Sequence, residues 1–494
     1  MSLDPQPSLK PSSRHDGPIN KWLVSLSVLM GAFLSVMDAN VVNLALPDMM
    51  TAFHVTLAQV TWVATVYTIG QIVAITMVGW SATLIGRKAL FMWSMGLFIL
   101  GSMLAGLSRN MPEIVLFRLI QGFGSGSLVP CSQAIISEVF PPAEQGTASA
   151  VYSAGVGVAP AIGPVIGGIL MDRFGWPAIF FINVPVCLVG LLMVWRYVED
   201  PRYLRRGLKG IDGIGIGLLA IGVGTVQLVV AEAGELGWFR SPLHLAASGL
   251  AATAVVSLVW WELRQPEPVV RVRLLHNRHL AAASILGTMT WLILYGSSFM
   301  IPQFCLSELG YDSYRTALVL LPRALLMLAV TPLAARLYNT SPRMVVALAS
   351  VLEAWSCWLL AGRMLAPSFT TLVLAQLPMA LGVGCIFVML TASALNSVPA
   401  AEKTGAAGLY TLARREGSNL AYALFASIIS FQTARRMGLL GDHRPLSAVH
   451  HVIGLAYRDA YMVGALAVVI SLPLTWMLPS RADVTSASLT TATE

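Results

Sequence analysis

The chain has 494 residues, of which 56% are hydrophobic and only 11% are charged, and its formal net charge is +7. Soluble globular proteins carry about 25% charged residues, so this composition excludes a soluble protein of this length and predicts an all-α polytopic membrane protein. The basic residues fall in loops between apolar segments, which excludes a compact nucleic-acid-binding domain. The five cysteines form no CxxC pair and the histidines show no ligand spacing, so we expect no metal site and no cofactor.

Residues 1–20 are polar and rich in Pro and Ser, and we expect a disordered tail before the first apolar segment. A membrane-spanning helix needs about 20 apolar residues. Fourteen windows meet this requirement, near residues 22–46, 58–80, 89–108, 111–134, 147–171, 177–197, 213–232, 242–261, 280–302, 315–335, 344–362, 369–395, 406–430 and 457–478.

Alternate assignment of the loops places 18 of the 31 Lys and Arg residues inside and 9 outside. This bias follows the positive-inside rule and predicts that both termini are cytoplasmic. An outer loop near 433–456 is the exception, because Arg435, Arg436 and Arg444 lie in it and Arg458 follows directly after it. Two basic inner loops flank one helix pair, with six spans on either side. We therefore predict a cytoplasmic tail (1–20), a six-helix bundle (21–198), an inserted helix pair with basic cytoplasmic linkers (199–278), a second six-helix bundle (279–479) and a cytoplasmic tail (480–494).

The first apolar segment contains one carboxylate, Asp38, at membrane depth. A charge there costs about 2.5–3.5 kcal/mol on insertion scales, so an intramembrane acid is a functional hypothesis. Span four contains Arg118, about 10 Å from its outer start at 1.5 Å per residue, and Asp38 lies about 12 Å from the outer end of span one. We predict that the two residues pair and that the pair has a functional role. A purely structural hydrogen bond is the alternative for each.

Two glycine-containing motifs are candidates for conformational roles. In residues 79–88, two glycines bracket a turn before a cationic pair, although an ordinary positive-inside loop would look the same; these residues are Gly79, Gly86, Arg87 and Lys88. In span five, small residues repeat every four positions and predict close helix contact, while Pro160 and Pro164 are expected to bend the helix. The span-five candidates are Gly163, Pro164, Gly167 and Gly168.

Other charges inside the spans are candidates for the substrate cavity. Glu353 lies mid-span and could recognise a cation, and a locally paired acid is the alternative. Arg323 follows a proline in span ten and could line a cavity, with a structural role as the alternative. Arg414, Arg415 and Glu416 are consecutive, and because neighbouring residues face different directions on a helix, at most part of this trio points inward.

Together these motifs resemble the major facilitator superfamily, and more closely its fourteen-helix drug:proton antiporter branch of the EmrB/QacA type. The matching residues are Met37, Asp38 and 43–47 in the first helix, Arg118, Gln121 and Gly122 in the fourth, Gly163, Pro164, Gly167 and Gly168 in the fifth, 176–185 before the sixth, 235–239 and 261–263 around the inserted pair, and Arg414 and Gly417 in the thirteenth. The resemblance implies a fold of two six-helix bundles with an inserted helical hairpin. It also implies that the fifth-helix motif marks antiporters. Thr83 and Leu84 depart from the family pattern, and this departure is expected to weaken the charge network that latches the two halves.

The resemblance implies proton-coupled multidrug efflux, in which amphipathic and often cationic small molecules leave in exchange for protons by alternating access. On this resemblance, Asp38 and Arg118 are the expected proton-coupling residues. The protein is expected in the lipid bilayer of the inner membrane. Proton-coupled export or import of one metabolite is the first alternative, and the fifth-helix motif argues against import. A subunit working with a periplasmic adaptor protein and an outer-membrane channel stays open. We expect no enzyme, because HExxH, P-loop and paired-acid motifs are missing from the sequence.

Overall fold

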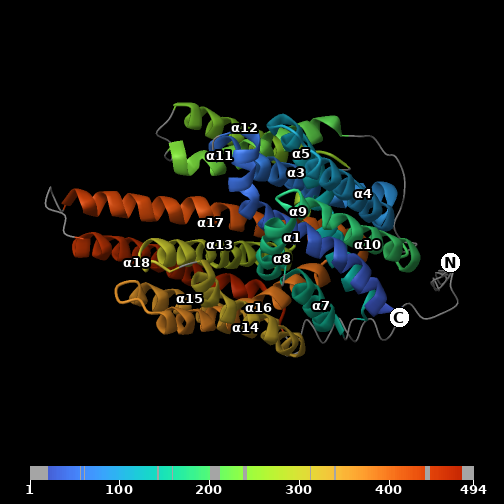
Figure 1. Ribbon diagram of the computed structural model, residues 1–494. Helices are drawn as coiled ribbons and strands as arrows, with labels where there is room; N and C mark the ends of the chain where they lie inside the picture. Colours follow the sequence, from blue (N-terminus) through green and yellow to red (C-terminus); the bar gives the residue numbers. More distant parts are fainter. Residues whose placement is uncertain are drawn as a thin grey trace, which may run out of the picture.

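The computed structural model describes residues 20–55, 57–60, 62–141, 144–157, 159–200, 212–236, 242–266, 268–311, 313–338, 341–439 and 446–480. These residues are helical or in short connections and include no strand. The all-α architecture predicted from composition is therefore confirmed (Figure 1). The predicted tails, apart from residues 20 and 480, and the linker at 201–211 lie outside the described residues.

The first part of the chain forms ten helical segments. They are α1 (Lys21–Phe53), α2 (Leu57–Val60), α3 (Trp62–Ile85), α4 (Arg87–Gly106), α5 (Met111–Gly126), α6 (Leu128–Val139), α7 (Gln145–Gly157), α8 (Ala159–Phe174), α9 (Ala178–Phe181) and α10 (Asn183–Tyr197). The side chain of Asn20 caps α1 by accepting from the backbone N–H of Trp22, and Asn110 caps α5 in the same way through Glu113. Such caps satisfy N–H groups that a helix leaves unpaired at its start.

Two helices separate this part from the last part of the chain. They are α11 (Gly213–Leu236) and α12 (Pro242–Glu262), and they pack on each other. Helix α11 also contacts α3 and α17, and Figure 1 shows the pair along the upper edge of the molecule. The inserted pair is thus in contact with both neighbouring parts of the chain.

The last part of the chain forms six long helices and three short 3₁₀ segments. They are η2 (Val272–His276), α13 (Arg278–Ser307), α14 (Ser313–Leu337), α15 (Pro342–Arg363), α16 (Phe369–Asn396), η3 (Ala400–Glu402), α17 (Lys403–Leu439), α18 (Leu446–Ser471) and η4 (Leu472–Met477). The bundle boundaries predicted from loop charge stay predictions.

Each of the fourteen predicted windows overlaps a described helix, and eleven segments among the described residues are long and apolar enough to cross a membrane. The number of fourteen crossings stays a prediction. The predicted outer loop at 433–456 is wrong over most of its length, because α17 runs to Leu439 and α18 begins at Leu446. Arg436, one of the positive charges assigned to this loop, forms an ion pair with Asp459, so its charge is balanced within the protein.

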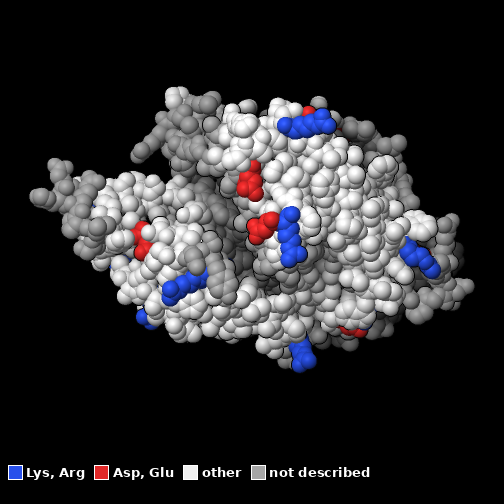
Figure 2. All heavy atoms as spheres, in the orientation of Figure 1, with Lys and Arg blue, Asp and Glu red and all other residues white. Residues whose placement is uncertain are grey.

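Two apolar cores follow the order of the chain. One is built from residues of α1–α10 together with Phe387, and another lies among α13–α18. Large apolar side chains also lie on the outside, among them Trp93, Trp195 and Trp476. Figure 2 shows a face with few charged side chains. An outside of this kind suits contact with lipid.

Candidate functional site

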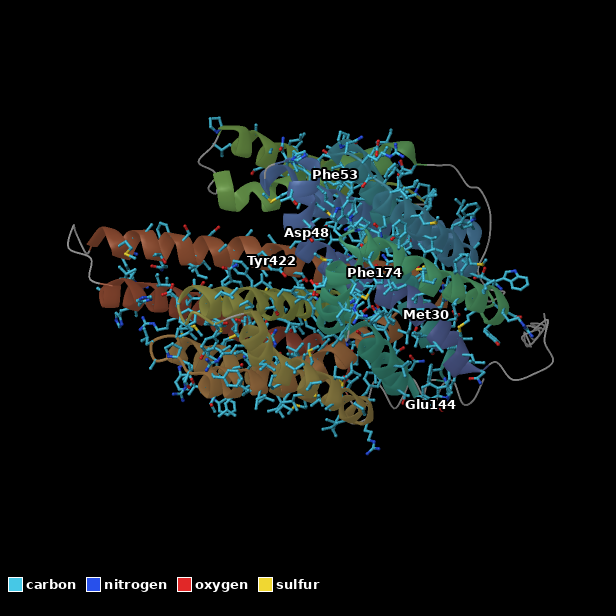
Figure 3. The ribbon with its side chains drawn as sticks, in the orientation of Figure 1. Met30, Asp48, Phe53, Glu144, Phe174 and Tyr422 are labelled. Atoms are coloured by element: carbon cyan, nitrogen blue, oxygen red, sulfur yellow. The ribbon has the colours of Figure 1, made fainter. Side chains whose placement is uncertain are left out.

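The ion pair predicted from membrane depth is present in the structure. The guanidinium Nη1 of Arg118 on α5 donates to Oδ2 of Asp38 on α1 at 2.5 Å. Asp38 is 2% exposed and Arg118 is fully buried. Because a buried charge is costly without a partner, each residue makes the burial of the other tolerable. Figure 3 shows α1 crossing the molecule, with Met30 near its start and Asp48 and Phe53 near its end.

Neutral donors complete the surroundings of the carboxylate. Oδ1 of Asp38 accepts from Nε2 of Gln121 at 3.0 Å and from Nδ2 of Asn183 at 2.9 Å. Both amides also donate to Oγ of Ser102, at 3.1 and 3.0 Å. The sequence motif before the sixth span contains Asn183, but only the structure assigns it and Ser102 to this site. Asp38 thus has three hydrogen-bond donors, of which one is charged.

Glycines of α8 hold α1 at close range beside this pair. A Cβ atom placed on Gly167 would lie 2.6 Å from Cγ1 of Val41, and one on Gly163 would lie 3.2 Å from Cγ of Met37. A Cβ on Gly168, by contrast, would meet no atom within 4 Å. The small-residue stripe predicted for span five therefore packs against the helix that carries Asp38. The side chains of Pro160 and Pro164 lie outside the described residues.

A series of polar contacts leads from the ion pair toward the space between the two halves. The ring of Tyr67 lies 4.0 Å from Cζ of Arg118, and its hydroxyl donates to the backbone oxygen of Ser35 at 3.0 Å. One turn along α3, Nε2 of Gln71 donates to Oγ of Ser125 at 3.0 Å. Gln71 lines a cavity, so contacts through α1 and α3 connect this cavity to Asp38.

That cavity lies between helices from both parts of the chain and has a free volume of about 100 Å³. Its lining comes from α1, α3, α5, α6 and α7 on one side and from α13, α14, α16 and α17 on the other. The lining residues are Val36, Gln71, Ile75, Gly126, Val129, Val156, Gly157, Trp291, Leu294, Tyr295, Met327, Phe387, Thr411, Arg414, Arg415 and Ser418. A mostly apolar lining with a few polar side chains is typical of sites that bind small organic molecules.

The cavity charge comes from α17. Arg414, which is 5% exposed, lies among three aromatic rings, with its Cζ 4.9 Å from Trp291, 4.8 Å from Phe387 and 4.6 Å from Tyr410. Arg415 also lines the cavity. The Nε atoms of both arginines have no hydrogen-bond partner among the described residues. Of these two arginines, only Arg414 matches the family pattern, and it was the cavity candidate on that ground.

Glu416 of the same trio faces the inserted helix α11. Both of its carboxylate oxygens lie near Nε2 of Gln227, at 3.2 and 3.3 Å. Oε1 of Gln227 in turn accepts from Nδ2 of Asn419 at 3.3 Å. Glu416 therefore does not line the cavity, and α11 makes polar contacts with the helix that does.

The two other predicted cavity residues do not line this cavity. Glu353 is 1% exposed, and its Oε2 accepts from Oγ1 of Thr290 at 3.3 Å. Arg323 donates to Oγ of Ser297 at 3.3 Å and of Ser298 at 2.7 Å. Both side chains lie in contacts with α13. The structure brings Asp38 and Arg118 together, and it does not bring Glu353 or Arg323 to Arg414.

The motif at residues 79–88 joins the two halves at the end of the molecule where α3 meets α4, which we call the Arg87 end. Arg87 forms an ion pair with Glu138 of α6, and its Nη2 donates to the backbone oxygen of Ala400 at 2.6 Å. From the other side, Nζ of Lys403 donates to the backbone oxygen of Ser137 at 3.4 Å. These contacts bind the first part of the chain to the last.

The remaining motif residues act within the same region. A Cβ on Gly79 would lie 2.8 Å from Cα of Gly405, so α3 and α17 touch at backbone distance. Gly86 precedes α4 with φ of 90°, a conformation that favours glycine. The backbone N–H of Lys88 donates to Oδ1 of Asp200 at 2.7 Å. Oγ1 of Thr83, by contrast, donates to the backbone oxygen of Trp80 within its own helix.

These features define a class of protein. A cavity between two helical halves inside an apolar bundle, with a buried acid–base pair beside it, is the arrangement of a secondary membrane transporter. The sequence profile of the Major Facilitator Superfamily matches residues 28–422. The chain therefore belongs to the major facilitator superfamily, as its motifs indicated.

The chain is similar in sequence to named multidrug export proteins. The multidrug export protein EmrB of Haemophilus influenzae is 30% identical over 431 residues, which cover 87% of this chain and 82% of that protein. The multidrug export protein EmrB of Escherichia coli is 28% identical over 397 residues, which cover 79% and 77%. The crystal structure of the human organic anion transporter MFSD10 shares the fold with a TM-score of 0.62 at 12% identity, over 91% of this chain and 99% of that one.

Proposed function

We propose that this protein is a proton-coupled multidrug antiporter of the inner membrane, with both termini in the cytoplasm. Support comes from the similarity to multidrug export proteins over most of the chain, from the cavity between the two halves and from the Asp38–Arg118 pair. Partnership with a periplasmic adaptor and an outer-membrane channel stays a prediction.

The fully buried Asp38–Arg118 ion pair is the observation on which the proposal of proton coupling rests. When Asp38 takes up a proton, Arg118 loses its counter-charge and retains only neutral acceptors, the backbone oxygen of Val63 and Oε1 of Gln121. An unpaired guanidinium at this depth is costly, so protonation favours a rearrangement around α1 and α5. A proton can then drive the change of conformation.

Substrate can compete with the proton through the helices that both sites share. Asp38 and the cavity residue Val36 lie on α1, while Tyr67 and the cavity residue Gln71 lie on α3. A ligand that displaces either helix changes the distance between Asp38 and Arg118. Two sites on one moving element give the coupling free energy that antiport requires.

The contacts at the Arg87 end, which we place on the cytoplasmic side, support the proposal of alternating access. Arg87 with Ala400 and Lys403 with Ser137 close the two halves there. For the cavity to open toward the cytoplasm, these contacts have to break. The close approach of Gly79 and Gly405 has to open with them.

Everted membrane vesicles test the proposal. With a proton gradient established by respiration, addition of a substrate of this protein is expected to release protons, as reported by a pH-sensitive dye, and vesicles without the protein serve as the control. Substrate movement that is unaffected when the gradient is dissipated would rule out proton-coupled antiport.

A further inference from the structure

Among the described residues that line it, the cavity has two arginines and no acidic side chain. Arg414 and Arg415 are the charged lining residues, and the rest are apolar, aromatic or neutral polar. The acids that sequence reasoning considered are accounted for elsewhere. Asp38 pairs with Arg118, Glu416 contacts Gln227, and Glu353 accepts from Thr290.

Arg414 keeps its charge for a ligand. No ion pair joins Arg414 to a carboxylate among the described residues, and its Nε has no hydrogen-bond partner. The rings of Trp291, Phe387 and Tyr410 hold the guanidinium through cation–π contact. Such contacts stabilise a cation without neutralising it. A guanidinium that is 5% exposed and lacks a carboxylate is prepared for an anionic group from outside the chain.

The rest of the cavity suits a hydrocarbon tail. The apolar wall of the cavity comes from both parts of the chain. The first part contributes Val36, Ile75 and Val129, and the last part contributes Leu294 and Met327. The side chain of Met is flexible and adapts to ligands of different shape. A head group at Arg414 and a tail against these residues would occupy both sides of the interface.

We propose that the cavity binds amphipathic organic anions, with the anionic head group at Arg414 and Arg415 and the apolar part against the walls. This inference rests on the proposed function as an exporter and names its substrate class. It replaces the expectation of cationic substrates. A cation in this cavity would meet two like charges, and a desolvated like-charge contact is unfavourable.

Binding to the purified full-length protein in lipid nanodiscs tests this inference without a proton gradient. The probes are laurate and dodecyltrimethylammonium, which carry alkyl chains of the same length and opposite charge, and empty nanodiscs correct for partition into lipid. We expect tighter binding of laurate. Arg414→Gln is expected to lower the laurate affinity about 10- to 100-fold, the loss of a charge-assisted hydrogen bond, without weakening the binding of the cation.

Matched variants separate a local charge from net charge. Arg363→Gln removes the same charge from an exposed position at the end of α15 and is expected to leave laurate affinity within twofold, a margin of about 0.4 kcal/mol. Arg415→Gln replaces Arg414→Gln if the latter does not fold. Equal or tighter binding of the cation by the wild-type protein overturns the inference, as does unchanged laurate affinity in a folded Arg414→Gln protein.

The outcome is separable from the proton-coupling proposal. Selective laurate binding without proton release in vesicles supports the anion site and contradicts antiport. Proton-coupled export of the cation by a protein that does not bind laurate contradicts the anion site and supports antiport.

Discussion

Substitution of Asp38 by asparagine tests the centre of the proposed mechanism. The new amide side chain would retain an oxygen that accepts from Gln121 and Asn183, now at 3.0 and 2.9 Å, but would lose the charge that faces Arg118 at 2.5 Å. Breaking one side of a buried pair costs about 3–5 kcal/mol. Because the two hydrogen bonds from the side-chain amides of Gln121 and Asn183 persist, we expect the lower end of this range, about 3 kcal/mol.

A double-mutant cycle distinguishes the structural role of the pair from its proposed role in proton coupling. Arg118→Gln in the Asp38→Asn background removes the unpaired guanidinium, so the double variant is expected to recover stability, with a coupling energy of about 2–3 kcal/mol. Stability is measured by unfolding in mixed micelles and coupling by substrate-dependent proton release in everted vesicles. The double variant is expected to be folded but uncoupled. Proton release at the wild-type level in Asp38→Asn would refute the proton role, and additive stability changes would refute the pair.

Further substitutions test the surroundings of this pair and of the cavity. Arg118→Lys is expected to transport poorly despite its retained charge, because Lys lacks the planar fork; wild-type transport would contradict the geometry of the pair. Gly167→Ala places a Cβ 2.6 Å from Val41 and is expected to destabilise the protein by about 1–3 kcal/mol, whereas Gly168→Ala, which meets nothing within 4 Å, should be tolerated in the same unfolding assay. Glu353→Gln is expected to change efflux of cationic and neutral compounds equally, because Glu353 lies outside the cavity lining; a selective loss of cation efflux would return it to the substrate site.

The depth of a residue in the membrane was predictable from the sequence, but the direction in which its side chain points around the helix axis was not. Counting residues from the ends of two apolar segments was enough to pair Asp38 with Arg118, because each helical residue advances by a fixed rise. The same counting placed Glu353 and Arg323 at membrane depth but did not show that both face α13. Which neighbour a side chain meets depends on how the helices pack, and a hydropathy profile carries no information on that rotation.

The consecutive charges of α17 show the same limit. Sequence reasoning held that Arg414, Arg415 and Glu416 cannot all face inward, and the structure places the two arginines at the cavity and the acid against α11. The contact with Gln227 could not be anticipated, because it depends on where the inserted pair lies. Helix ends were also misjudged at Phe53 and Leu439, since hydropathy windows stop where the apolar stretch stops and hydrogen-bonded helices continue.

The distribution of charge between the two halves has an energetic consequence for export. In the proposed mechanism the acid of the first half binds a proton only by giving up its partner, and the cavity arginines of the second half, which have no acid beside them among the described lining residues, bind an anion. With the cell interior negative, one elementary charge crossing the membrane is worth about 2.3 kcal/mol per 100 mV. An anion leaving and a proton entering both move with this field, so a one-for-one exchange gains about 4.6 kcal/mol per 100 mV. The exchange of a univalent cation for one proton moves no net charge and therefore gains no free energy from the membrane potential. An exporter whose cavity selects anions would use the membrane potential as well as the proton gradient.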